Sequence, residues 1–233
     1  MKNKILPILP VVIIFMFFIP LPAVVIYVLF GLDVVALLFW AGCKLFMNIK
    51  NKQLEWFPSF ALFWNLFTLG VLIALTRIIL NQRNPDNVNK VTNLIFSNET
   101  TITETIIDVI VFLCLTTAGL LINSSEKKRI KTIWEEIKQK GIKEDMEFYS
   151  SMDGVIKFAH GTFTAILFIT VVIFLGGTLI DNLQFGKPII TCIVGNLKQA
   201  IGISIIFQAL VLFFTFLFVT CFYKVQENYM REE

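Results

Sequence analysis

Long apolar runs separated by short polar segments dominate this chain. The first run, at the N-terminal end, is uncharged except at Asp33. A membrane-spanning helix needs about 20 apolar residues, so this run is too long for one helix and fits two. Pro20 and Pro22 lie at the natural break, because proline removes a backbone donor and disfavours helix at the preceding residue. The pattern therefore predicts a helical hairpin with spans near 5–20 and 23–43.

Four further apolar runs predict the remaining spans. The third and fourth spans are expected near 57–80 and 106–123, and two more within 158–223, the last beginning near residue 199. The fold class that follows is all-α: a polytopic integral membrane protein of about six transmembrane helices.

One charged block, residues 124–157, separates the fourth span from the fifth. Its first part is expected to be helical, with Ser124 or Ser125 as the N-cap and Gly141 as the C-terminal stop. An apolar stripe at helical spacing supports this: Ile130, Ile133, Trp134 and Ile137. Such a helix either docks a partner or the membrane surface, or packs on its own membrane domain.

Basic residues indicate the orientation, because cytoplasmic loops of membrane proteins are rich in Lys and Arg. With six spans, Lys and Arg concentrate on one side, at both ends of the chain, in segment 44–52 and in 124–157. The opposite side carries few. We therefore predict that both termini, the 124–157 block and the tail at 224–233 are cytoplasmic.

The amino-acid composition is typical of a protein embedded in a lipid bilayer. Hydrophobic residues make up 56% of the 233 positions, and mean hydropathy is +0.76. Charged residues make up 16%, against about 25% in soluble chains. The net charge of +3 is unremarkable, and no nucleic-acid partner is expected.

Enzyme motifs are missing from the sequence. There is no P-loop, no HExxH and no GxSxG motif, and a single His excludes a two-His metal site. The cysteines lack ligand spacing and lie in or beside apolar stretches: Cys43, Cys114, Cys192 and Cys221. We expect no enzymatic activity, no metal and no cofactor.

Ionisable residues inside predicted spans are functional candidates, because charge in hydrocarbon is costly. Asp33 lies near the middle of the second span, where it must be protonated, paired or facing a wet cavity. Alternatively, the hairpin turn lies nearer Asp33 and leaves it at the surface. Arg77 ends the third span, where its long side chain can reach the headgroups.

The sharpest polar cluster stands at the entrance to the fifth span. Asp153, Lys157 and His160 are spaced i, i+4 and i+7, which places them on one face of a helix. An acid, a base and an imidazole at a membrane entrance suit proton uptake. They equally suit an ordinary interfacial ion pair.

The segment Glu147–Phe158 resembles the "DFYGAMDGASKF" stretch of the FHIPEP family, the FlhA/InvA/LcrD-type export-gate proteins of flagellar and type III secretion. Other segments resemble family motifs in the same order: Ile19–Pro22 ("IPLP"), Phe57–Ser59 and Thr76–Leu80 ("FPS…STRLIL"), and Ile169–Thr170 with Gly176–Gly177 ("IT…IGG"). Together they cover roughly residues 12–180.

This resemblance implies a part in protein export driven by the proton motive force, in the bacterial cytoplasmic membrane. It implies a ring-shaped homo-oligomer, with other export-apparatus membrane proteins and exported proteins as partners. Asp153, Lys157 and Arg77 match the family's proton-coupling and characteristic polar positions. His160 and Asp33 remain candidates from the sequence pattern, and Pro20 with Pro22 forms the family-like hairpin.

Several family positions carry different residues here. Thr68 stands in place of an Arg, and Thr162 and Asn196 stand in place of Asp. Tyr27 replaces an acidic residue, and Asp33 an Asn. The family's signature cytoplasmic segment and large cytosolic domain are expected to be absent. Three alternatives therefore remain open: a reduced paralogue, a structural or assembly protein without transport, and a small-solute or ion transporter.

Overall fold

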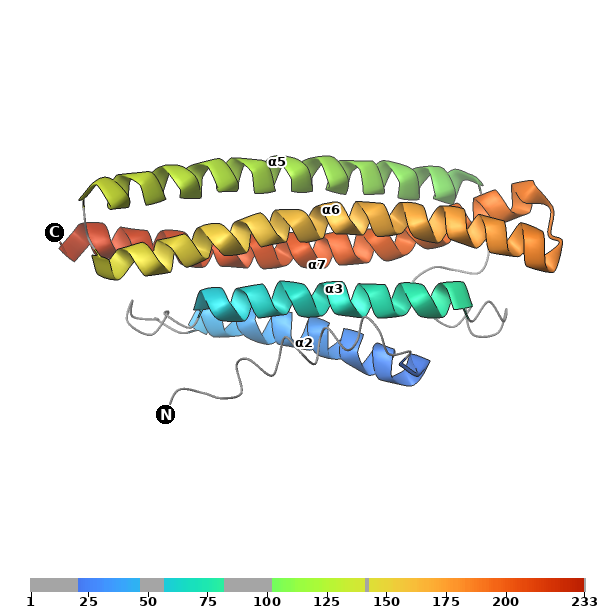
Figure 1. Ribbon diagram of the computed structural model, residues 1–233, viewed down its shortest axis with the longest axis horizontal. Coiled ribbons are helices and arrows are strands. Elements are labelled where there is room, and N and C mark those ends of the chain that lie inside the picture. The colour runs from blue at the N-terminus through green and yellow to red at the C-terminus, as the bar shows by residue number, and fades with distance from the viewer. Residues whose placement is uncertain (1–20, 47–56, 82–101, 141–142, 233) are drawn as a thin grey trace.

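The computed structural model describes residues 21–46, 57–81, 102–140 and 143–232. These residues form long helices and contain no strand. The helices, labelled in Figure 1, are α2 (Ala23–Phe46), α3 (Phe57–Asn81), α5 (Ile102–Lys140), α6 (Lys143–Phe185) and α7 (Ile189–Glu232).

All five helices are long and apolar enough to cross a membrane, by length and composition. Their candidate spans are Val24–Gly42, Pro58–Leu80, Thr105–Glu135, Ser150–Phe185 and Ile189–Thr220. The prediction of an all-α, multi-pass membrane protein is confirmed. The predicted first span at 5–20 lies outside the described residues, so five of the six expected spans are seen.

Pro22 precedes the first described helix and helps to start it. Its carbonyl oxygen accepts from the backbone N–H groups of Val25 and Ile26, at 3.0 and 3.3 Å. Proline suits the start of a helix, because the N–H groups of the first turn have no partner within the helix and proline has no N–H to leave unpaired. Pro20, its predicted partner in the hairpin, lies outside the described residues.

The helices extend beyond the apolar runs that predicted them. α5 continues without a break through Ser124 and Ser125, so the predicted N-cap there is wrong. The preceding turn already supplies carbonyl partners to the backbone N–H groups at that point, and no cap is needed. Gly141, the predicted stop, lies outside the described residues. α7 begins at Ile189, about ten residues before the predicted start.

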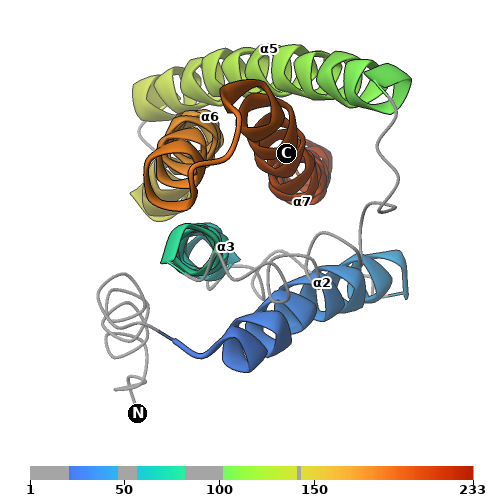
Figure 2. The same cartoon turned by 90° about the vertical axis from the view of Figure 1, so that its right-hand side faces the viewer.

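α6 is the central helix of the bundle. Figures 1 and 2 show α5, α6 and α7 packed together, with α3 against α6 and α2 on the outer side of α3. α5 and α6 run antiparallel, as do α6 and α7. The end at which α5 finishes and α6 begins is called here the predicted cytoplasmic end, because it carries the basic block.

Two apolar clusters hold these helices together. The cluster in the middle of the bundle joins α3, α6 and α7 through buried side chains that include Leu72, Ile79, Phe163, Ile173, Ile203 and Phe207. The second cluster lies toward the predicted cytoplasmic end. It joins α3, α5, α6 and α7 through Trp64, Ile130, Met152, Ile156, Phe214 and Phe218.

The apolar stripe of the charged block takes part in the second cluster. Ile130 is fully buried, and Ile133 and Trp134 pack partly buried beside it. This stripe therefore packs on its own membrane domain, which is the second of the two interpretations of the sequence. Ile137 is among the residues whose side chains are not described.

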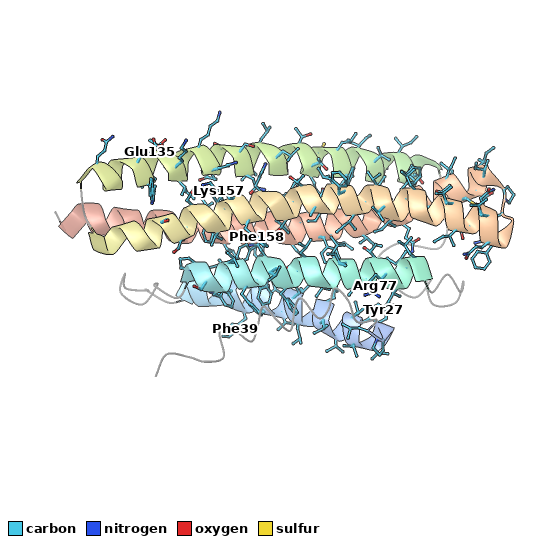
Figure 3. The ribbon with its side chains drawn as sticks, in the orientation of Figure 1. Tyr27, Phe39, Arg77, Glu135, Lys157 and Phe158 are labelled. Atoms are coloured by element: carbon cyan, nitrogen blue, oxygen red, sulfur yellow. The ribbon has the colours of Figure 1, made fainter. Side chains whose placement is uncertain are left out.

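Large apolar side chains cover the outer faces of α2 and α5. Val24, Phe39 and Leu121 are each exposed by about two thirds or more, at 72%, 71% and 66%. Figure 3 shows Phe39 pointing away from the bundle. In a multi-pass protein these faces meet lipid, so the exposure is what a membrane helix requires.

Candidate functional site

The first candidate site is an ion pair on α6, near the predicted cytoplasmic end. Lys157 Nζ donates to Asp153 Oδ2 one helical turn away. The Asp153 side chain is 20% exposed, while that of Lys157 is 53% exposed (Figure 3). The second carboxylate oxygen, Oδ1, is buried and has no hydrogen-bond partner among the described residues.

His160 lies on the same continuous helix, α6, as Asp153 and Lys157. The i, i+4 and i+7 spacing therefore places the three residues on one face, as predicted. Its ring is half-buried, and the Nδ1 atom is buried without a hydrogen-bond partner in the described part of the chain. The structure thus brings Asp153 and Lys157 into contact and places His160 beside them without a hydrogen bond to either.

The second candidate site is a buried carboxyl between α2 and α3. Asp33 has no exposed surface, and Thr68 Oγ1 donates to its Oδ1 at 3.1 Å. Its other oxygen, Oδ2, has no hydrogen-bond partner within the described segments. The alternative in which a turn leaves Asp33 at the surface is wrong, because α2 continues unbroken from Ala23 to Phe46.

Thr68→Val is expected to destabilise the protein by about 1–3 kcal/mol, since it leaves a buried carboxyl without its donor. Thr117→Val is the matched control, because the Thr117 hydroxyl is exposed and donates only to the Leu113 carbonyl of its own helix. Chemical unfolding in detergent micelles measures both. Equal, small effects of the two variants would show that the contact with Asp33 contributes nothing.

Arg77 and Tyr27 lie at the opposite end of the bundle from the ion pair. Figure 3 labels both side chains at this end, Arg77 on α3 and Tyr27 on α2. Arg77 is half-buried close to the end of α3. That position at the end of a span fits the predicted reach toward the headgroups, which stays a prediction.

A third polar cluster closes the turn between α6 and α7. Asp181 accepts from Lys187 Nζ at 3.2 Å and from Asn196 Nδ2 at 2.9 Å. Asn196 also donates to the Cys192 carbonyl at 2.8 Å. The sequence analysis placed two spans within 158–223 and no polar cluster between them. The one available signal was Asn196, which stands at an acidic position of the family pattern.

Polar side chains also lie between the helices in the bundle interior. The hydroxyls of Thr170 and Ser204 form a hydrogen bond that links α6 to α7. Gln208 Nε2 donates to Thr116 Oγ1 at 3.0 Å and links α7 to α5. Sequence reasoning missed both pairs, because a lone polar residue in an apolar run does not reveal its partner.

No group of three or more His, Cys, Asp or Glu side chains that could hold a metal occurs in residues 21–46, 57–81, 102–140 and 143–232. The clusters above consist of groups that form hydrogen bonds and ion pairs. Asp153 combines a carboxylate, a cationic partner and access to solvent, and Asp33 combines a carboxyl with full burial.

No family model matches the chain, and no solved structure matches it. Among curated proteins, it is 25% identical over 213 residues to "Low calcium response locus protein D" of Yersinia pestis. The protein of the same name from Yersinia pseudotuberculosis matches equally. The chain is a distant relative of these proteins.

The similarity covers 79% of this chain but 30% of the relative. The chain therefore spans about a third of the length of the curated proteins that it matches. The relation extends over most of the described helices, and it agrees with the LcrD-type resemblance of the sequence motifs.

Proposed function

We propose that this chain is a membrane component of a bacterial type III protein-secretion apparatus, located in the cytoplasmic membrane. The observation that carries the proposal is the similarity to low calcium response locus protein D across 79% of the chain. The ordered family-like motifs and the five candidate spans support it. Other membrane proteins of the apparatus, further copies of this chain and the exported proteins are its proposed partners.

Asp153 is the proposed site of coupling to the proton motive force. Its carboxylate is partly exposed at the predicted cytoplasmic end, so a proton can reach it from solvent. Protonation removes the negative charge that holds Lys157, and the ion pair opens. α6 contacts α3, α5 and α7, so a movement of α6 would act on three neighbouring helices. This step rests on the family resemblance as well as on the geometry.

Deletion of the gene in its native host tests the proposal. We expect the proteins secreted by the type III pathway to disappear from the culture supernatant and to accumulate in the cells. A plasmid copy of the chain is expected to restore secretion. Quantitative mass spectrometry of supernatants and cells measures the effect. An unchanged secretome under inducing conditions would contradict the proposal.

A structural or assembly role without transport is the second candidate. The observation that favours it is the loss of charge at four family positions, which are now Tyr27, Thr68, Thr162 and Asn196. This role predicts that the deletion disturbs the assembly of partner proteins, while a neutral residue at position 153 has no effect.

A further inference from the structure

Asn123 carries a side-chain amide that is fully buried in the bundle. It lies on α5, has no exposed surface, and neither Oδ1 nor Nδ2 has a hydrogen-bond partner in the parts of the chain that the structure describes. Burying an amide without partners is costly, and native proteins rarely accept it. A small polar ligand that hydrogen-bonds to Asn123 would remove this cost.

The contacts between α5 and α6 show which residues lie at the same level as Asn123. Gly119 of α5 meets the ring of Phe163 on α6. These helices are antiparallel, so a step forward along α5 matches a step back along α6. Asn123 lies four residues after Gly119, and Ala159 lies four residues before Phe163. Asn123 is therefore level with Ala159 and its neighbour His160. Each step of four residues is about 6 Å along the helix axis.

α7 contributes a hydroxyl at the same level. Gln208 donates to Thr116 at 3.0 Å, and α5 and α7 run in the same direction. Seven residues further along each helix come Asn123 and Thr215. Thr215 is buried and donates to the Val211 carbonyl at 2.9 Å, so its oxygen remains able to accept.

Two other polar atoms of α6 that lack a hydrogen-bond partner in the described residues lie toward the predicted cytoplasmic end. They are His160 Nδ1 and Asp153 Oδ1, both on α6. Asp153 precedes Ala159 by six residues, which is about 9 Å along the axis. Asn123, His160 and Asp153 thus offer three groups with unmet hydrogen bonds, and the Asp153 side chain reaches solvent.

We infer that a short file of water molecules enters the bundle beside Asp153, passes His160 and ends at the Asn123 amide. Water fits the site because a buried water typically binds two to four polar groups. Lipid does not fit, because Asn123 is fully enclosed by its own chain. The inference rests on these unsatisfied atoms and does not depend on the proposed function.

Water-edited solid-state NMR of the full chain in lipid bilayers tests this site. The protein carries ¹⁵N-labelled asparagine, and the Asn123 side-chain signal is assigned by its loss in Asn123→Leu, or in Asn123→Ser if the leucine variant does not fold. Asn65 is the internal reference, because it is equally buried but its Nδ2 donates to the Ala61 carbonyl at 3.1 Å. We expect magnetisation from water to reach Asn123 several-fold faster than Asn65. Equally slow transfer to both amides would overturn the inference.

The sign of a stability change gives a second test. If water fills the site, Asn123→Leu expels the terminal water and places an apolar side chain against the rest of the file, so Tm in detergent falls by about 2–4 °C. If the site is dry, the same substitution removes an unsatisfied amide from an apolar interface, and Tm rises. A rise would therefore overturn the water file independently of the NMR result.

Discussion

Asp153→Asn is expected to reduce secretion through the type III pathway to the background of the gene deletion, while protein level and membrane insertion stay normal. The substitution keeps the size of the side chain and replaces the carboxyl with an amide, which cannot take up and release a proton. It also removes the charge that holds Lys157 on α6. Quantification of secreted proteins in the native host measures the effect.

A matched control comes from a second ion pair with the same spacing. Lys131 and Glu135 lie one turn apart on α5, 3.7 Å from each other, and both are well exposed. Exposed pairs of this kind contribute about 0.5 kcal/mol or less, so Glu135→Gln should leave secretion unchanged. Normal secretion in Asp153→Asn would remove the proposed coupling role from this carboxylate and favour the structural role.

Gly119→Ala is expected to destabilise the protein by about 1–3 kcal/mol, although alanine is normally the better residue in a helix. A methyl group at this position would overlap the ring of Phe163. That ring is fully buried in the central cluster, so its neighbours must also move if it shifts. Chemical unfolding in detergent, followed by circular dichroism, measures the change.

Gly161→Ala is the control, because a methyl group there meets nothing within 4 Å. It should stabilise the protein by about 0.5–1 kcal/mol through helix propensity alone. Phe163→Leu combined with Gly119→Ala should recover part of the loss, since it removes the overlapping ring atoms. Equal effects of the two glycine substitutions would contradict the close packing of α5 on α6.

The helices themselves were predictable, because an apolar run of about 20 residues has few alternatives to a spanning helix. The charged extensions were harder to place. The end of α5 and the start of α6 carry mixed residues, and whether they continue a span or form a separate element depends on packing. Ile130 is buried against α6 and α7, and this contact keeps the charged end of α5 in line with its span. Sequence spacing does not specify such a contact.

The candidate sites were predictable to different degrees. Asp153 and Lys157 contact each other because they are one turn apart, and helical spacing alone predicts such a pair. The burial of Asp33 depends instead on α2 lying against α3, and its partner Thr68 is 35 positions away. Asn123 gave no sequence signal at all, because a polar residue near the end of an apolar run usually marks the membrane surface.

Affinity purification tests the central claim most directly. The tagged chain is extracted from native membranes with a mild detergent, and the proteins that copurify are identified by mass spectrometry, with an unrelated multi-pass protein of the same membrane as control. The proposal predicts enrichment of membrane proteins of the type III secretion apparatus over this control. Recovery of the chain alone, or only with copies of itself, would contradict its placement in that apparatus.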